Sequence, residues 1–201
     1  MSKNSSFPEI ALLRQHLRTE VRSLRRALTP DQQLFAAHQV ARRVAKHPRI
    51  QSAHSVAAFL SFDGELPTRP VIEQLWRDGK RVVLPILHPF SAGHLLFLDY
   101  QPSTTLKTNR LKILEPTLDV RHILPINQLD IILTPLVAFD STGQRLGMGG
   151  GFYDRTLQHW QERGPYPIGL AHDVQQVECI PAQEWDVSLP EIITPERTWV
   201  W

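Results

Sequence analysis

The stretch "LDIILTPLVAFD" (129–140) and the loop that follows it, "STGQRLGMGGG" (141–151), decide the fold class. Residues 129–140 are the most apolar segment of the chain, typical of a strand buried on both faces and interrupted at Pro135. Four of the ten glycines then fall between residues 147 and 151, directly before "FYDRTLQHWQER" (152–163), which has the pattern of a helix. A buried strand that enters a helix through a glycine-rich loop is typical of an α/β fold.

The same alternation of strand and helix extends to both sides of this unit. Apolar runs typical of buried strands are found at 54–60, 81–87, 94–100 and 166–172. Helical patterns are found at 9–28, 30–46 and 69–80, the last of which closes at Gly79. The proline-punctuated segment 101–126 predicts no regular element.

This order of elements predicts a single α/β domain over residues 1–201. We expect a three-layer sandwich with a mostly parallel central sheet flanked by helices, and with the N-terminal helices (9–46) packed on the core. Ligands of such folds bind at the carboxyl ends of the strands. The loops "SFDGE" (61–65) and "DSTGQRLGMGGG" (140–151) both follow predicted strands, so we expect them to face one common site.

The first predicted helix (9–28) has two faces of different character. Its apolar face carries Ile10, Leu13, Leu17, Val21, Leu24 and Leu28. Its other face carries arginines at four-residue spacing, Arg14, Arg18, Arg22 and Arg26, with Arg25 beside them. A stripe of this kind is usually a solvated helix face, and the alternative is a surface for nucleic acid. Thr29, Pro30 and Gln32 then form the capping box that predicts the start of the second helix.

Composition limits the classes to which the chain can belong. With 42% hydrophobic residues, the 201 residues can bury a core without disulfides or metal. Cys179 is the single cysteine, which excludes an intramolecular disulfide and is typical of a reducing compartment. The start "MSKNSSFPEI" (1–10) lacks the apolar region of a signal peptide, and no apolar run is long enough to cross a bilayer. From these features we expect a soluble, cytoplasmic protein without a membrane partner, and the net charge of only +2 argues against a nucleic-acid partner.

The glycine loop (147–151) predicts an anion site. Glycine allows positive φ and leaves main-chain N–H groups open to a ligand, and the helix that follows adds the positive end of its dipole. Such an arrangement binds phosphate, and Arg145 and Arg155 on either side would add charge-assisted hydrogen bonds. Asp154 is placed to hold Mg²⁺ together with substrate phosphates. The loop is neither a Walker A loop nor a dinucleotide fingerprint, and the alternative is a flexible turn without a ligand.

The segment "LTPLVAFDSTGQRLGMGGGFYDRTL" (133–157) closely resembles the signature of the 5-formyltetrahydrofolate cyclo-ligase family, also called the methenyltetrahydrofolate synthetases. The likeness continues in the family's order through "RQHLRTEVRSLRRALTPDQQ" (14–33), "VAAFLSFDGELPT" (56–68), "WRDGKRVVLP" (76–85) and "PIGLAHDVQQVECIPAQEWDVSLPEIITPE" (167–196). It covers the chain from about Arg14 to Glu196. Each segment alone is a weak signal, but the combination is highly specific.

The resemblance implies an ATP- and Mg²⁺-dependent ligase of one-carbon metabolism. It would convert 5-formyltetrahydrofolate, with or without a polyglutamate tail, into 5,10-methenyltetrahydrofolate and release ADP and phosphate. The formyl oxygen is phosphorylated first because it is a poor leaving group, and N10 of the folate then attacks and expels phosphate. Catalysis of this kind rests mainly on positioning and on neutralising phosphate charge. We expect a monomer, and the alternative is a non-catalytic regulator that binds nucleotide or folate on the same fold.

The resemblance also implies roles for individual residues. Arg145 and Tyr153 are expected to act in catalysis and Asp154 to bind Mg²⁺. The residues implied in ATP binding are Arg14, Arg18, Arg145, Leu146, Gly147, Met148, Gly149, Gly150, Gly151, Phe152 and Tyr153. Those implied in folate binding are Leu60, Glu65, Met148, Gly149, Gly150, Gly151 and Phe152. Without the resemblance, Leu60 would be interpreted as core packing and Glu65 as an ordinary loop glutamate, although a carboxylate suits the donor edge of the pterin ring.

The chain departs from the family pattern at the phosphate site and at the metal site. Arg14 stands where the family has lysine, which keeps the charge but changes the geometry. Met148 and Gly150 stand where some members have arginine and lysine, so Arg145 and the N-terminal arginines are expected to neutralise more of the phosphate charge. Pro190 occupies the place of a second metal-binding aspartate, and the alternative carboxylates are Asp186 and Glu191.

Two further residues are interpreted as structural. His172 lies beside Asp173 but shows no metal-ligand spacing to another histidine, so we expect a structural or surface role. Cys179 has no neighbouring feature that would lower its pKa, and we expect a buried apolar side chain rather than a nucleophile.

Overall fold

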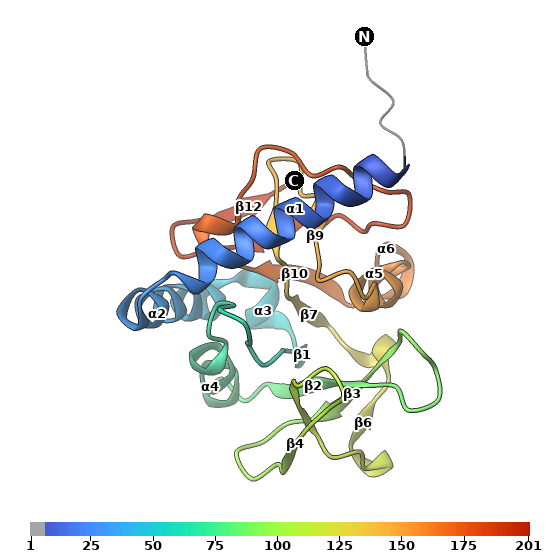
Figure 1. The fold of residues 1–201 in the computed structure, drawn as a ribbon. Coiled ribbons are helices and arrows are strands. Elements are labelled where there is room, and N and C mark those ends of the chain that lie inside the picture. Colours follow the sequence, from blue (N-terminus) through green and yellow to red (C-terminus); the bar gives the residue numbers. More distant parts are fainter. Residues whose placement is uncertain (1–6) are drawn as a thin grey trace.

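The computed structural model describes residues 7–201 and contains a central eight-stranded sheet (Figure 1). The strand order is β12-β11-β10-β7-β1-β2-β3-β6. The five strands from β11 to β2 are parallel, and the outer strands on the two sides, β12 on one and β3 and β6 on the other, are antiparallel to their neighbours. The bounds are Ser55–Ala57 for β1, Arg81–Leu87 for β2, Leu95–Asp99 for β3, Ile123–Leu124 for β6, Ile131–Thr134 for β7, Tyr166–Leu170 for β10, Glu191–Ile193 for β11 and Thr198–Val200 for β12. The predicted α/β class with a mostly parallel central sheet is confirmed.

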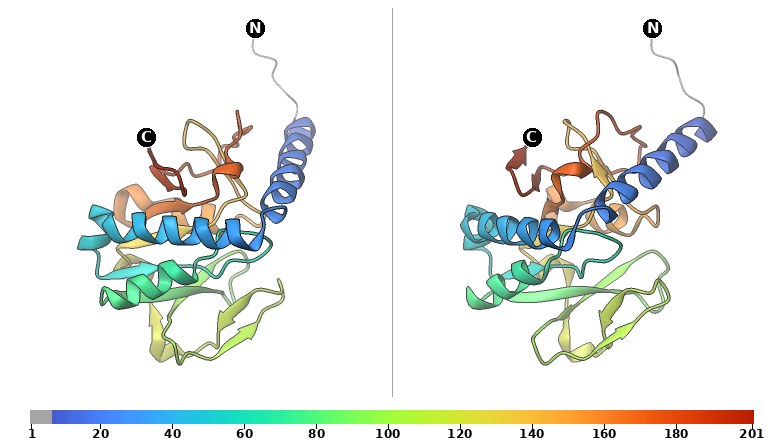
Figure 2. Two further views of the ribbon diagram at one scale, coloured as in Figure 1. Left: turned by 90° about the vertical axis from the view of Figure 1, so that its left-hand side faces the viewer. Right: turned by 60° about the vertical axis from the view of Figure 1, so that its left-hand side comes forward.

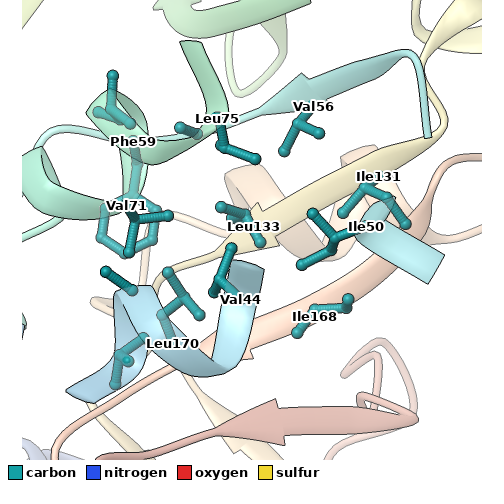
Figure 3. Packing of buried hydrophobic residues seen from close by; sticks show 14 of the residues in the cluster. Val44, Ile50, Val56, Phe59, Val71, Leu75, Ile131, Leu133, Ile168 and Leu170 are labelled. Atoms are coloured by element: carbon teal, nitrogen blue, oxygen red, sulfur yellow. The ribbon is translucent and has the colours of Figure 1, made fainter. Parts of the chain in front are cut away.

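Helices cover both faces of this sheet and produce the predicted three layers (Figure 2). One face is covered by α2 (Pro30–Lys46), α3 (Pro48–Ser52) and α4 (Arg69–Arg77), and the other by α5 (Phe152–Leu157) and α6 (Trp160–Arg163). Successive strand residues point to opposite faces, as the pleat requires. Val56 and Ile131 therefore pack beneath α2 to α4 (Figure 3), whereas Ala57 and Ile132 pack on the side of α5.

The helix α1 (Phe7–Arg26) differs from the expectation for residues 9–28 in the face that it buries. Val21 is buried in a small core cluster, but Leu13 and Leu24 of the predicted apolar face are 46% and 48% exposed. Arg14 and Arg25 are buried instead. The prediction of the buried face was therefore partly wrong. The reason is that α1 lies on loops that present carbonyl and carboxylate oxygens, and these oxygens bind guanidinium groups.

The capping box at the start of α2 is confirmed by its hydrogen bonds. The Gln32 N–H donates to the Thr29 hydroxyl, and the Thr29 N–H donates to the Gln32 side-chain oxygen. Residues 81–87 form β2 as predicted. The strand predicted over 54–60 is shorter, because the chain leaves the sheet after β1 towards a cavity.

The predicted helix over 152–163 is divided into α5 and α6. His159 between them departs from helical geometry, at φ −120° and ψ 21°. The break allows Trp160 to pack edge-to-face on Tyr166, with ring centroids 5.5 Å apart. The apolar segment 129–140 is interrupted at Pro135 as predicted, and only its first half joins the central sheet as β7.

Two small antiparallel sheets complete the architecture. β8 (Ala138–Phe139) pairs with β9 (Arg145–Leu146) directly before the glycine loop. β4 (Leu106–Thr108) pairs with β5 (Leu114–Pro116) inside the segment for which no regular element was predicted. Over residues 7–201, the helices are too short or too polar to span a membrane.

Candidate functional site

A cavity of about 600 Å³ lies at the carboxyl ends of the central strands. Residues 59–65 enter its wall after β1, residues 135–136 enter after β7, and the glycine loop follows β9. The two loops that were expected to face one site therefore do so. A second, more open hollow lies on the other side of Gly149–Gly151 towards α6, and Asp154 and Asp186 belong to the wall between the two.

Most of the residues predicted from the resemblance line this cavity. They are Arg14, Arg18, Leu60, Glu65, Arg145, Gly147, Met148, Gly149, Gly150, Gly151, Phe152, Tyr153 and Asp154. Leu146 does not line it, because its side chain is buried in the core cluster of Val21, Val137, Ala138 and Ile180. Leu60 packs against the core and also lines the cavity, so its role in packing is confirmed and its contact with folate stays a prediction.

The glycine loop has the backbone that its composition predicts. Gly149 and Gly151 have φ values of 97° and 65°, in the left-handed region that glycine adopts without strain. The loop carbonyls are held by side chains: Arg18 Nε donates to Gly147 O at 2.8 Å, and Arg155 donates to Gly150 O. Within residues 7–201, the main-chain N–H groups of 148–151 donate no hydrogen bond, so these donors are free for a ligand.

Arginines supply the positive charge next to these donors. Arg145 is buried and pairs with Asp154, and its Nε has no hydrogen-bond partner among the described residues. Burial and the nearby Arg14 lower the pKa of Arg18, with Asp186 acting in the opposite direction. Arg18 is thus a partly buried cation beside a second cation, Arg14. An anionic ligand would stabilise this arrangement.

Two carboxylates lie in the same wall. Asp154 pairs with Arg145, and Asp186 receives Nη2 of Arg14 at 2.9 Å and the Gln183 N–H at 2.8 Å. No group of three or more acidic, histidine or cysteine side chains in residues 7–201 forms a metal cage. One or two carboxylates completed by phosphate oxygens and water are, however, the usual ligands of Mg²⁺. The residues present therefore fit that ion.

The structure distinguishes the two alternatives for the second carboxylate. Asp186 lines the cavity, whereas Glu191 is the first residue of β11, at the opposite end of the parallel strands. There Glu191 accepts the Tyr166 hydroxyl at 2.8 Å and contacts His47. Glu191 is thus engaged in joining the sheet to α2, and Asp186 is the carboxylate available to the site.

A second part of the cavity wall, formed after β1, carries Glu65, which is 7% exposed. Its Oε2 accepts the Phe62 N–H at 3.3 Å, and its Oε1 lies 3.7 Å from Arg25. Burial raises the pKa of Glu65 to about 7, and Arg25 acts in the opposite direction. Burial also raises the pKa of Tyr153 above its ordinary range, with Glu65 contributing, so Tyr153 is a neutral hydroxyl donor at pH 7.

Residues 12–195 match the family described as 5-formyltetrahydrofolate cyclo-ligase. The chain belongs to this family. It is 61% identical over 181 residues to the 5-formyltetrahydrofolate cyclo-ligase of Escherichia coli K12, a match that covers 90% of this chain and 100% of the relative. The Haemophilus influenzae protein of the same name is 50% identical over 180 residues, with 90% and 96% covered. The solved structure of Aquifex aeolicus 5,10-methenyltetrahydrofolate synthetase superposes with a TM-score of 0.79 at 25% identity, covering 94% of this chain and 92% of that one.

This member of the cyclo-ligase family also has cavity residues that sequence reasoning missed. The β4–β5 hairpin contributes Asn109, Leu111, Ile113 and Leu114 to the cavity. Asn109 donates to Glu115 at 2.9 Å, and Glu115 in turn accepts the Leu87 N–H at 3.0 Å, which attaches the hairpin to β2. No periodic pattern marks these residues, because the hairpin is short and its segment is punctuated by prolines.

Three other predictions of side-chain roles can be compared with the cyclo-ligase structure. Arg155 does not point into the cavity, since its Nε donates to Gly93 O at 2.8 Å and it also holds Gly150. His172 is buried, which excludes the surface role and leaves the structural one as a prediction, and burial together with Arg25 lowers its pKa to about 4. Cys179 is exposed, so its predicted burial was wrong. It lies in an irregular surface segment in which Ile180 is the side chain that enters the core.

Proposed function

We propose that the protein converts 5-formyltetrahydrofolate to 5,10-methenyltetrahydrofolate with ATP and Mg²⁺, releasing ADP and phosphate. The observation that carries this proposal is one cavity with two chemically different walls. One wall has free main-chain N–H donors and arginines, and the other has a buried carboxylate. The names of the relatives from Escherichia coli and Haemophilus influenzae support the same reaction.

The glycine wall suits a polyphosphate. Free N–H groups in a loop with left-handed residues approach phosphate oxygens without a Cβ in the way. Arg18 and the unpaired Nε of Arg145 add charge-assisted donors at the same wall. We therefore assign the ATP phosphates to residues 147–151 with Arg14, Arg18 and Arg145 around them.

Asp154 and Asp186 would hold Mg²⁺ next to those phosphates. When bound, the ion neutralises phosphate charge and orients the transferred group. Each aspartate is paired with an arginine in the structure, and both side chains line the cavity wall.

The Glu65 wall suits the folate. The pterin ring presents adjacent N–H donors, and a carboxylate accepts two of them at once. Around Glu65 the cavity is apolar, with Phe59, Leu60 and Ile86 available to contact the aromatic rings. Phe152 lines the cavity directly after the glycine loop, and its ring lies against Gly150, so the formyl group and the phosphates would meet beside it.

The chemistry requires that the formyl oxygen become a leaving group. Its lone pair takes up the terminal phosphoryl group of ATP, and ADP departs with the electrons of the broken P–O bond. N10 then attacks the activated formyl carbon and loses its proton. Phosphate leaves with the electron pair of the C–O bond that breaks. Arg145 would stabilise charge on the transferred phosphoryl group, and the neutral Tyr153 hydroxyl would donate a hydrogen bond to the same group.

Formation of methenyltetrahydrofolate tests this function directly by its absorbance, with 5-formyltetrahydrofolate, ATP and Mg²⁺ supplied. We expect product to form and ADP to be released only when the folate is present. A non-catalytic regulator would bind either ligand without releasing ADP. Nucleic-acid binding is not favoured, because Arg14, Arg18, Arg22 and Arg25 are directed to oxygens of the protein itself.

We further propose that the protein acts as a cytoplasmic monomer. A lone cysteine is typical of a reducing compartment, and Cys179 is exposed. Both walls of the cavity are built from one chain.

Replacing Glu65 by glutamine is expected to weaken folate binding by roughly 1–3 kcal/mol, because one charged acceptor becomes a donor that faces the pterin amines. The affinity for ATP should stay nearly unchanged, since the glycine wall is not altered. Separate KM values for the two substrates check this, with thermal melting as a control for folding. If ATP affinity falls and folate affinity holds, the assignment of this wall is wrong.

A further inference from the structure

Arg25 is the arginine of α1 whose side chain is completely buried, at 0% exposure. Its guanidinium lies between two loops that follow different strands. After β1, Asp63 accepts Nε through its carbonyl at 2.9 Å and Nη2 through its carboxylate at 3.0 Å. After β7, Leu136 O accepts Nη1 at 3.3 Å. A buried guanidinium is tolerated only with such partners, so these contacts hold both loops against α1.

The loop that Arg25 contacts has an uncommon backbone at Asp63 and Gly64. Both residues have positive φ, 55° and 74°, and for Asp63 this conformation is unfavourable without support. The Asp63 carboxylate is held by Arg22, Arg25 and Arg26. A Cβ on Gly64 would lie 3.1 Å from the Arg25 carbonyl, so α1 and the loop meet backbone to backbone. The position of Glu65 depends on this contact.

Glu65 is the second carboxylate within reach of Arg25. Arg25 Nη1 lies 3.7 Å from Glu65 Oε1, close enough for an ion pair. Asp63 cannot neutralise Arg25 alone, because three arginines share its single charge. Hydrogen bonds from these arginines outweigh its burial and lower the pKa of Asp63 to about 2. The positive charge of Arg25 is therefore not fully compensated by Asp63, and it can also attract the Glu65 carboxylate.

We propose that Arg25 is a positioning residue that holds Glu65 in its ionised form and in place at the cavity wall. In this form Glu65 accepts the donor edge of the folate ring. The identity of that ligand rests on the proposed function, whereas the ion pair and its geometry do not.

The titratable groups that face Glu65 come from four elements: Arg25 on α1, Asp63 on the same loop, Tyr153 on α5 and His172 after β10. Tyr153 and His172 are neutral at pH 7, because burial raises the pKa of the first and lowers that of the second to about 4. Arg25 thus supplies the positive charge among them. Since burial raises the pKa of Glu65 to about 7, folate affinity should fall as the pH drops through 7. Removal of the Arg25 charge should raise the pH at which half of the folate affinity is lost, the midpoint of this pH dependence.

Three variants test the proposal through the pH dependence of the KM for 5-formyltetrahydrofolate. Arg25→Met should move the midpoint upwards by about one pH unit or more and weaken folate binding about tenfold at pH 7, without a matching rise in the KM for ATP. Arg25→Lys keeps the charge and should retain the wild-type midpoint. Arg26→Met is the matched control, because Arg26 also pairs with Asp63 but is half exposed and, within residues 7–201, forms no ion pair with Glu65. It should leave the folate profile unchanged.

A double-mutant cycle with Glu65→Gln separates the possible causes. If Arg25 acts through Glu65, Arg25→Met should change folate affinity by no more than about twofold once Glu65 is glutamine. Equal losses in both backgrounds would overturn the proposal, as would an unshifted midpoint in folded Arg25→Met. Should Arg25→Met not fold, a shifted midpoint in Arg25→Lys would overturn it. If Glu65→Gln alone leaves folate affinity unchanged, Glu65 does not bind folate, and it is the proposed function of this wall that is overturned.

Discussion

Replacing Asp154 by asparagine is expected to lower turnover by roughly 10²–10³-fold, the usual range when one preorganised electrostatic contact is removed from an active site. Asp154 lies in the cavity wall next to the glycine loop and is one of two carboxylates that would hold Mg²⁺. Asparagine keeps an oxygen that can accept the hydrogen bond from Arg145 but loses the charge that attracts the metal.

Whether this variant folds depends on the surroundings of the Asp154 side chain. Asp154 is not a surface residue: its side chain is 17% exposed and pairs with the buried Arg145. The substitution therefore disturbs a mostly buried ion pair, and the retained amide oxygen is what should preserve the fold.

Mg²⁺ titration distinguishes a metal defect from a displaced Arg145. If Asp154 is a metal ligand, the loss in turnover should be greatest at limiting Mg²⁺, and excess Mg²⁺ should partly restore the turnover. Asp140→Asn is the matched control, because Asp140 accepts the N–H groups of Thr142 and Ile180 but does not line the cavity. It should lower the melting temperature more than turnover. Unchanged turnover of Asp154→Asn at limiting Mg²⁺ would show that Asp154 is not the metal ligand.

Replacing Gly149 by valine is expected to raise the KM for ATP by about tenfold or more, corresponding to about 1.4 kcal/mol or more of lost binding. Gly149 has a φ of 97°, which a β-branched residue adopts only with strain. A Cβ at this position would lie 3.6 Å from the Arg18 guanidinium, an ordinary contact, so crowding inside the protein is not the cause. The loop would instead shift, and its free N–H donors would leave the positions that they hold in the structure.

Gly79→Val provides the control for backbone strain alone. Gly79 follows α4, has a φ of 69°, and has open space where a Cβ would lie, but it is not part of the cavity. We expect both variants to melt at somewhat lower temperatures and only Gly149→Val to raise the KM for ATP. Near-normal ATP kinetics in Gly149→Val would indicate that the glycine cluster is a flexible turn that does not bind ATP. A loss of stability without an ATP defect would indicate a packing role, of the kind that Gly169 has, where a Cβ would lie 2.8 Å from Ile192 and Leu189.

Local chemistry was enough to predict several elements. The apolar run that forms β2, the capping box of α2 and the interruption at Pro135 each depend on a few neighbouring residues, and the structure confirms all three. The glycine loop was also predictable from local chemistry, because glycine adopts positive φ without strain and Gly149 does so here. The loops after β1 and β9 were expected at one site because parallel strands end at the same edge.

The pairing of charged groups could not be predicted in this way. Arg14 and Asp186 are 172 residues apart, and Arg25 and Leu136 are 111 apart, so no local pattern relates them. The same limit explains why Asp186 and Glu191 remained alternatives until the fold placed them at opposite ends of the parallel strands. The β4–β5 hairpin, which completes the cavity, likewise depends on its attachment to β2 through Glu115.

The sequence by itself determined the α/β class, the positions of most strands and helices, the glycine loop and the family. These features follow from residue spacing and from local backbone preferences, which are properties of short segments. Only the tertiary structure decided which face of α1 is buried, because hydrophobic periodicity assumes an apolar partner. In this protein α1 lies on loops rich in oxygen acceptors, so guanidinium groups are buried and leucines are exposed. The environment of Glu65, and with it the proposed dependence of folate binding on Arg25, exists only after those loops have met the helix.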